Sequence, residues 1–432
     1  MDNREKKTHK KYKVNNELYS EDDFLKDCPN SQFIPTVLPA VSRIIAIGDI
    51  HGDLDLAIKS FKLANLIDDD FNWIANPPDT VVVQVGDQID SCRPIPGVYD
   101  CHTKKYPDDK AEDMTIIKFF DDMHKKAFAA GGAVYSLFGN HELMNSQGRF
   151  GYVSYDNFYN FKYESEDGTM YEGPNGRKAA FKPGGPVATM LACSRISVLI
   201  VGSTMFVHAG VLPILAKKLD HLHLDSETKL KYLNAIVRKW LLRKLSEKDK
   251  ENKSLFLDDG ELSPFWTRIY GIIPENVKLD TNECFNSVKK TIEVFKIGHI
   301  VVGHTPQLFT NKNGINGTCY EKSGENKLYR VDGGFSKAFK IFDNQNLIQI
   351  LEIIDDSIFN IITDTNIPTS IDIPGTLVTE TTKEPDININ ETQMRKIASI
   401  YSQNRTTSER SKSRLLRSKK SKKLSANKKL IY

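Results

Sequence analysis

Hydrophobic residues of the first half of the chain fall into short runs that alternate with amphipathic stretches. Three apolar, mostly β-branched runs, at 42–47, 80–85 and 133–138, have the length and composition of buried strands. The two stretches between them, 53–66 and 114–130, repeat apolar residues at helical spacing. Strands that alternate with helices in this way predict parallel βαβ units.

The pattern changes after residue 196. Two apolar runs enclose Gly202-Ser203, which predicts a hairpin with a two-residue turn. Helices are expected at 211–222, 227–245 and 284–296, and further strands at 299–302, 314–320, 327–331 and 347–354. We therefore expect an α/β (α+β) fold, built as a sandwich of two mixed β-sheets flanked by helices.

The two ends of the chain differ from its body in composition. Residues 1–40 mix charge and proline and predict a basic, poorly ordered N-terminal arm, whereas 41–358 form one folded domain. Residues 359–432 read as a linker and a basic, largely disordered tail, with one short helix considered at 391–401. The net charge of +3 therefore combines a mildly acidic body with basic ends. Such a tail can contact nucleic acid or acidic surfaces, or can simply keep the chain solvated.

The six cysteines are scattered and include no CxxC pair. Free thiols in a reducing compartment are expected, and a disulfide is considered only between Cys92 and Cys101, which share one loop. The sequence contains no run of about 18 uncharged apolar residues, so no membrane span is expected. The N-terminus also lacks the apolar stretch of a secretory signal. A cytoplasmic location is expected, and the basic tail would permit a nuclear one.

Five polar segments each follow an apolar run. They are Gly48-Asp49-Ile50-His51-Gly52, Gly86-Asp87-Gln88-Ile89-Asp90, Gly139-Asn140-His141-Glu142, His208-Ala209-Gly210 and Gly303-His304-Thr305. One such residue alone would more often be a helix cap or a structural histidine. The ordered set of carboxylate, amide and imidazole donors instead suits two neighbouring Mn, Fe or Zn ions. The expected ligands are Asp49, His51 and Asp87 for one ion, and Asp87, Asn140, His208 and His304 for the other.

Two further roles follow from this assignment. His141 is not needed as a ligand if Asn140 is one, so we expect it to protonate the leaving group, with Asp90 holding its ring. Phosphate should also meet a guanidinium fork. Arg268, after an aromatic pair, is the first candidate, followed by Arg149 and by Arg93. A surface salt bridge is the alternative for each arginine.

These segments resemble the PPP-type phosphoprotein phosphatases within the calcineurin-like metallophosphoesterases, over about residues 42–336. Further segments are similar to the bacterial-type, "Shewanella-like" branch. They are Gly139-Asn140-His141-Glu142-Leu143-Met144-Asn145 with Gly148-Arg149-Phe150, Phe181-Lys182-Pro183-Gly184-Gly185-Pro186, and Pro264-Phe265-Trp266-Thr267-Arg268 with Val302-Gly303-His304-Thr305-Pro306-Gln307. The resemblance implies a ββ-sandwich fold, two bound metals and hydrolysis of phosphomonoesters on protein side chains. It also implies the ligand and acid roles given above and favours Arg268 as a phosphate binder.

The chain departs from the family pattern at two places; the first bears on activity and substrate, and the second agrees with the bacterial-type branch. The family commonly has Arg-Gly after the second Asp of GDxxD, whereas this chain has Ser91-Cys92, and its next arginine is Arg93. The tyrosine-bearing C-terminal motif of the eukaryotic enzymes is absent, and Val331-Asp332-Gly333-Gly334-Phe335-Ser336 stands near its place. The long loop 92–109 is expected to overhang the active site and to help select substrates.

The main hypothesis is a metal-dependent phosphoprotein phosphatase that acts on phosphoserine, phosphothreonine or phosphotyrosine through attack of a metal-bridging hydroxide. One alternative keeps the chemistry but takes small phosphorylated molecules, such as dinucleoside polyphosphates or cyclic nucleotides. Another is a degenerate phosphatase that acts as a binding scaffold. A phosphorylated protein is the expected partner, and the sequence does not indicate an oligomeric state.

Overall fold

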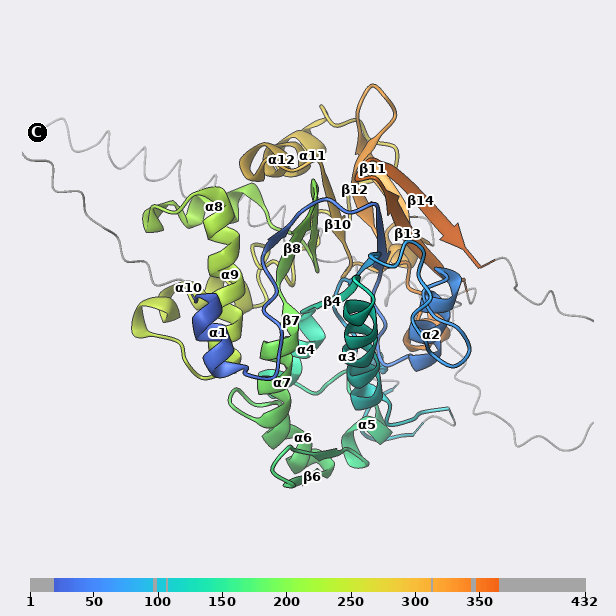
Figure 1. Cartoon of the computed structure of the whole chain (residues 1–432), viewed down its shortest axis with the longest axis vertical. Coiled ribbons are helices and arrows are strands. Elements are labelled where there is room, and N and C mark those ends of the chain that lie inside the picture. Colours follow the sequence, from blue (N-terminus) through green and yellow to red (C-terminus); the bar gives the residue numbers. More distant parts are fainter. Residues whose placement is uncertain (1–18, 96–98, 106–107, 312–313, 343–346, 365–432) are drawn as a thin grey trace, which may run out of the picture.

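Two six-stranded mixed sheets form the centre of the computed structural model, which describes residues 19–95, 99–105, 108–311, 314–342 and 347–364 (Figure 1). The first sheet has the order β1 (Val37–Leu38), β8 (Val198–Val201), β9 (Thr204–Val207), β10 (His299–Val302), β12 (Asn326–Arg330) and β11 (Asn316–Tyr320). The second has the order β14 (Ile358–Thr363), β13 (Gln349–Ile354), β2 (Arg43–Ile47), β3 (Val81–Gln84), β4 (Ala133–Leu137) and β7 (Arg195–Ile196). A separate hairpin joins β5 (Lys162–Glu164) and β6 (Met170–Glu172).

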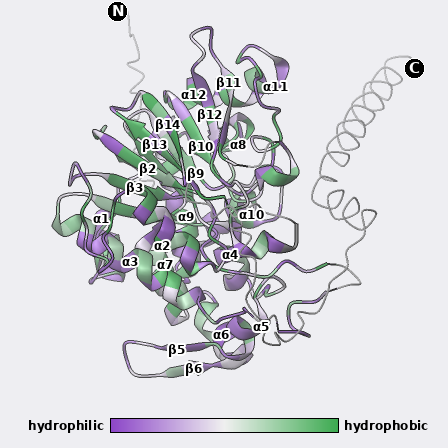
Figure 2. Cartoon of the chain, turned by 90° about the vertical axis from the view of Figure 1, so that its right-hand side faces the viewer, coloured by the Kyte–Doolittle hydropathy of each residue, from purple (hydrophilic) through white to green (hydrophobic). Residues whose placement is uncertain are grey.

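The two sheets pack face to face, and helices cover their outer faces. In β2 the side chains of Ile44 and Ala46 join the cluster between the sheets, while Ile45 and Ile47 join the cluster beneath the helices. This alternation follows from the two-residue repeat of a strand. Because both faces of the central strands are buried, these strands are mostly apolar, as the hydropathy colours of Figure 2 show; Arg43 and Gln84 are the buried polar exceptions in β2 and β3.

Helices α2 (Leu54–Leu63) and α3 (Asp113–Ala129) cover the second sheet, and α7 (Pro186–Ser194), α9 (Ser226–Leu241) and α12 (Lys290–Phe295) cover the first. The side chain of Asp53 caps α2 by accepting a hydrogen bond from the Leu56 amide. The other α-helices of the described residues are α1 (Glu21–Asp27), α4 (Asn140–Ser146), α5 (Tyr155–Tyr159), α6 (Gly173–Phe181), α8 (Pro213–Lys218), α10 (Glu247–Leu257) and α11 (Asn282–Cys284). None of the helices in the described ranges is both long and apolar enough to cross a bilayer.

The expected sandwich of two mixed sheets flanked by helices is confirmed, but the two ends of the domain differ from prediction. Part of the expected N-terminal arm is ordered: a capping box at Ser20 starts α1, and Phe24 is fully buried. At the other end, β14 (Ile358–Thr363) pairs with β13 and extends the second sheet beyond the predicted boundary at residue 358. The basic tail and the helix considered at 391–401 lie outside the described residues.

The expectation of free thiols is wrong for this structure, because all six cysteines form disulfides. Cys28 pairs with Cys193, Cys92 with Cys101 and Cys284 with Cys319, at Cα separations of 5.5, 5.9 and 5.6 Å. Only the second pair, which lies within one loop, was considered from sequence. The first pair is 165 residues apart and the third 35, so the fold rather than local spacing brings them within bonding distance.

We predict that unreduced protein, once denatured, has no thiol that reacts with a thiol-specific dye, whereas six react after reduction, one for each cysteine of the chain. The Cys28→Ser variant is the matched control, since it should release the single thiol of Cys193. Six reactive thiols in the unreduced, denatured protein would contradict the three disulfides.

Candidate metal centre

The five polar segments meet because they follow strands whose carboxyl ends point the same way. In the second sheet β2, β3 and β4 are parallel, so the loops that carry Asp49, Asp87 and Asn140 leave the same edge. In the first sheet β9 and β10 are parallel, and His208 and His304 follow their ends. Side chains that are far apart in sequence therefore converge on one point, as is usual at the carboxyl ends of parallel strands.

Several residues of the centre hold unusual backbone conformations. The φ angles of His51, Asp87, Asp90 and His304 are 47°, 55°, 73° and 66°, which places them in the left-handed region. Non-glycine residues in this region cost on the order of 1–3 kcal/mol each and concentrate at functional sites. The surrounding fold therefore holds these four side chains in directions that a relaxed loop would not adopt.

Two glycines allow the segments to pack directly on the carboxylates. A Cβ atom at Gly139 would lie 2.1 Å from Asp87 Oδ1, and one at Gly303 would lie 2.2 Å from Asp49 Oδ1. The carboxylate oxygens occupy this space and accept hydrogen bonds from nearby backbone amides: His141 N donates to Asp87 Oδ1 at 2.9 Å, and His304 N donates to Asp49 Oδ2 at 3.0 Å. The glycines thus let neighbouring loops fix the two carboxylates.

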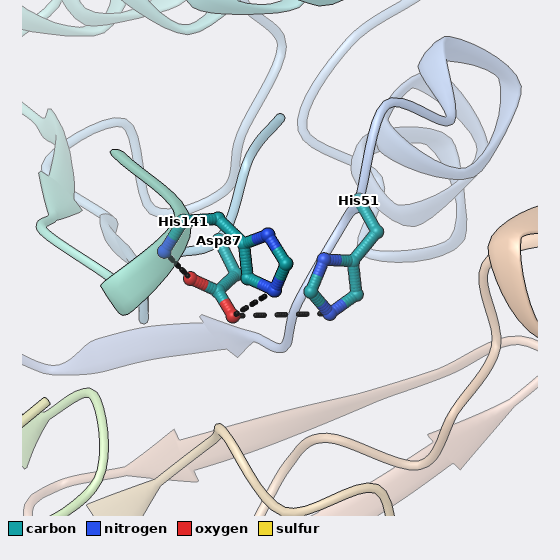
Figure 3. Close-up of side chains that lie close together, drawn as sticks. All are labelled: His51, Asp87 and His141. Atoms are coloured by element: carbon teal, nitrogen blue, oxygen red, sulfur yellow. Dashed lines mark hydrogen bonds and ion pairs between the residues drawn. The ribbon is translucent and has the colours of Figure 1, made fainter. Parts of the chain in front are cut away.

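One donor cluster gathers around Asp87 on the side of β2. His51 Nε2 and His141 Nε2 each lie 3.8 Å from Asp87 Oδ2, and the two rings face this oxygen in Figure 3. His51 Nε2 is also 3.8 Å from Asp49 Oδ2. The structure therefore brings together the three ligands expected for the first ion, with His141 beside them.

A second cluster approaches the same oxygen of Asp87. His208 Nε2 is 3.3 Å from Asp87 Oδ2, and Asn140 Oδ1 is 2.9 Å from His208 Nε2 and 2.8 Å from His304 Nδ1. The second nitrogen of each ring is held by a backbone carbonyl, that of Val85 for His208 and that of Trp266 for His304. Such outer contacts orient imidazole ligands. Asp87, Asn140, His208 and His304 form the donor set expected for the second ion.

The buried charges of the centre fit cations. Burial, together with the carboxylates of Asp332 and Asp87, raises the pKa of Asp49 well above its ordinary value, and burial raises the pKa of Asp332 to about 6. Burial and the Arg93 charge lower the pKa of His51 well below its ordinary value, which favours the neutral ligand form. Asp49 Oδ1 and His51 Nδ1 are buried without a hydrogen-bond partner in the described part of the chain. Divalent ions would compensate this arrangement.

Asp332 is a residue of the centre that the sequence analysis missed. It follows β12, which is parallel to β10, and is 2% exposed. Its Oδ1 accepts a hydrogen bond from Gly334 N, while Oδ2 has no partner among the described residues. The available signal was its position directly after a predicted strand, the same position that marked the other acidic residues.

The expected general acid is held by a buried network. His141 Nδ1 lies 2.8 Å from Asp90 Oδ2, so Nε2 faces the donor cluster. Asn145 Nδ2 donates to both carboxylate oxygens of Asp90 at 3.0 Å. Arg177 also forms an ion pair with Asp90, with Nη2 3.4 Å from Asp90 Oδ1. Sequence reasoning missed Arg177, because an arginine on an amphipathic helix looks like a surface residue.

The three arginines proposed for phosphate binding lie in different surroundings. Arg93 is 5% exposed, stacks at 4.6 Å on Phe339, and donates from Nη1 to the carbonyls of Asp90 and Cys92. Arg268 is half-buried and donates to the His304 carbonyl, and its charge helps burial to lower the pKa of His304. Arg149 pairs with Asp259 at 2.6 Å on an exposed surface. Arg93 and Arg268 therefore contact residues of the centre directly. Arg149 is instead linked to it through the Trp266 ring, which lies 5.3 Å from its guanidinium and 5.9 Å from the His304 ring.

Comparison with known proteins assigns the chain to a family. Residues 42–308, more than half of the chain, match the calcineurin-like phosphoesterase family. The chain belongs to this family. The matched span contains all five polar segments, from Asp49 to His304. Membership makes the chain a metallophosphoesterase, a family that uses divalent metal ions, and the donor clusters described above could bind such ions.

Individual relatives support the Shewanella-like branch of this family. Shewanella-like protein phosphatase 2 of Arabidopsis thaliana is 28% identical over 374 residues, which cover 79% of this chain and 83% of that protein. Uncharacterized protein R398 of Acanthamoeba polyphaga mimivirus is 65% identical over 246 residues, or 57% of this chain and 98% of that protein. A solved cold-active protein tyrosine phosphatase shares the fold, with 20% identity and a TM-score of 0.50 over 76% of this chain and 81% of that one. The resemblance to this branch is confirmed, and the Arabidopsis relative supports a phosphatase activity.

We predict that Gly303→Ala lowers the metal content of the protein from two Mn²⁺ ions per chain to about one or fewer. The added methyl group would displace Asp49, whose Oδ1 lies 2.2 Å from the new atom. Metal analysis after dialysis against Mn²⁺ measures this, with circular dichroism to confirm folding. Gly260→Ala, where a Cβ meets nothing within 4 Å, should retain both ions. Two ions in both variants would show that the close approach does not matter.

Proposed function

We propose that this metallophosphoesterase is a phosphoprotein phosphatase that hydrolyses phosphomonoesters on serine, threonine or tyrosine side chains. The observation that carries the proposal is the Asp87 carboxylate, which both donor clusters share, with the His141–Asp90 pair next to it. The Arabidopsis relative, which is named a protein phosphatase and is similar over 79% of the chain, favours a protein substrate over a small phosphorylated molecule.

Each group has a defined task in this proposal. Two ions held by the ligands of the two clusters would supply an activated water and neutralise charge on the phosphate oxygens. His141 presents Nε2 on the side of Asp87 while Asp90 holds Nδ1, so the imidazole can protonate the leaving oxygen. The guanidinium groups of Arg268 and Arg93 would bind the remaining phosphate oxygens and orient the phosphorus for in-line attack.

We predict that the wild-type protein, supplied with Mn²⁺, hydrolyses a phosphotyrosine or a phosphothreonine peptide. Asp87→Asn should abolish turnover, because it removes the carboxylate shared by both donor clusters. His141→Ala should lower kcat by about 10²–10⁴-fold, the usual contribution of general acid catalysis. Phosphate release measures both effects, and the better peptide names the substrate class.

Two outcomes would contradict the proposal. If neither peptide is hydrolysed but dinucleoside polyphosphates or cyclic nucleotides are, the chain takes small substrates. If no phosphate ester is hydrolysed although two metal ions bind, the chain acts as a binding scaffold.

We further predict that Arg268→Ala and Arg93→Ala each lower kcat/KM by about 10–100-fold, the effect of removing a charged hydrogen bond to phosphate. Arg149→Ala should change kcat/KM by less than about threefold, since this side chain pairs with Asp259 on the surface. Initial rates with one phosphopeptide measure all three variants. A larger loss in Arg149→Ala than in Arg268→Ala would reverse the assignment.

A further inference from the structure

Arg177 of α6 is a buried cation in contact with the general-acid pair. Its side chain is 0% exposed, and all three of its nitrogen atoms make hydrogen bonds. Nε donates to Asn145 Oδ1 at 2.9 Å, and Nη1 donates to the Asn157 carbonyl at 3.1 Å. Nη2 lies 2.8 Å from Asp113 Oδ2 and 3.4 Å from Asp90 Oδ1. One guanidinium thus connects four groups from four different segments.

The groups that Arg177 connects are those that orient His141. Asn145, which Arg177 holds through its amide oxygen, turns its amide nitrogen toward both oxygens of Asp90 and toward the His141 carbonyl, each at 3.0 Å. Asp113, the other carboxylate bound by Arg177, accepts a hydrogen bond from the Asp90 amide at 3.2 Å. The backbone and the side chain of Asp90 are therefore both fixed through partners of Arg177.

Two aromatic rings hold the guanidinium in place. Its carbon lies 4.8 Å from the ring centre of Phe181 and 5.5 Å from that of Phe161. The carboxylates of Asp90 and Asp113 are 0% and 1% exposed, and burying such charges without a partner costs several kcal/mol each. A planar, forked cation can satisfy partners in three directions, which the single ammonium of a lysine cannot do.

We propose that Arg177 is a positioning residue for the general acid: through Asp90 and Asn145 it holds the His141 imidazole with Nε2 directed toward the phosphate site. The inference rests on the phosphatase reaction proposed above, because it concerns protonation of the leaving oxygen. Without Arg177, Asp90 would lose a buried partner and Asn145 could rotate away. His141 would then sample orientations that cannot reach the leaving group.

The test compares two substrates that differ in their need for an acid. p-Nitrophenolate leaves easily without a proton, whereas phenolate, the more basic leaving group, benefits from one. A positioning role for Arg177 therefore predicts that Arg177→Met lowers kcat on phenyl phosphate at least tenfold more than kcat on p-nitrophenyl phosphate. His141→Ala sets the reference for this selective loss, and Arg177→Lys should lie between the wild type and Arg177→Met.

Arg238 provides a matched control elsewhere in the fold. It is 4% exposed, lies 4.9 Å from the ring of Phe24, and donates to the Ala192 carbonyl. Arg238→Met and Arg238→Lys should therefore leave the ratio of the two kcat values unchanged, whatever they do to stability. If Arg177→Met does not fold, the comparison of Arg177→Lys with Arg238→Lys decides by the same ratio.

An equal loss on both substrates in the Arg177 variants, or no loss, would overturn the positioning role while leaving the phosphatase function intact. A wild-type protein that, in the presence of Mn²⁺, hydrolyses neither these two compounds nor a phosphopeptide would instead overturn the proposed function, and this inference with it.

Discussion

The concentration of buried negative charge at one edge of the sandwich is the constraint on which the candidate site depends. Asp49, Asp87 and Asp332 are each at most 5% exposed, and their carboxylates lie within electrostatic reach of one another. Such a group is unstable in a protein interior unless cations or hydrogen-bond donors compensate it. The imidazoles, the backbone amides and the nearby guanidinium groups provide part of this compensation. Divalent ions would provide the rest.

The sandwich supplies the rigidity that this arrangement requires. Each sheet is buried on both faces, so the strands that lead into the site loops are anchored by the core between the sheets and by the cores beneath the helices. The left-handed residues at 51, 87, 90 and 304 can persist because the elements on either side of them cannot shift. The site therefore depends on packing far from the donor atoms.

The sequence made the sheets and the donor segments predictable, because both have local signals. A run of β-branched residues followed by glycine and an acid, as at Gly48-Asp49 and Gly86-Asp87, predicts a buried strand and the start of the following loop. The disulfide between Cys28 and Cys193 and the contacts of Arg177 have no such signal. Each joins segments that only the tertiary fold brings together, so periodicity and spacing cannot reveal them. Asp332 is an intermediate case, since its local signal was present but its motif was read only as a marker of the family branch.

The departure at Ser91-Cys92 shows how the fold can preserve a charge whose position in the sequence has changed. The family's usual arginine directly after the second Asp is missing, yet Arg93 turns back and donates to the carbonyls of Asp90 and Cys92. Its guanidinium lies between the rings of Phe339 and Tyr152, at 4.6 and 5.7 Å, and the disulfide from Cys92 ties the loop. Its charge lowers the pKa of His51, in addition to the larger effect of burial, so it acts within the centre itself. The phosphate-binding role proposed for this displaced arginine therefore depends on aromatic packing and backbone carbonyls, because these contacts determine where the guanidinium lies.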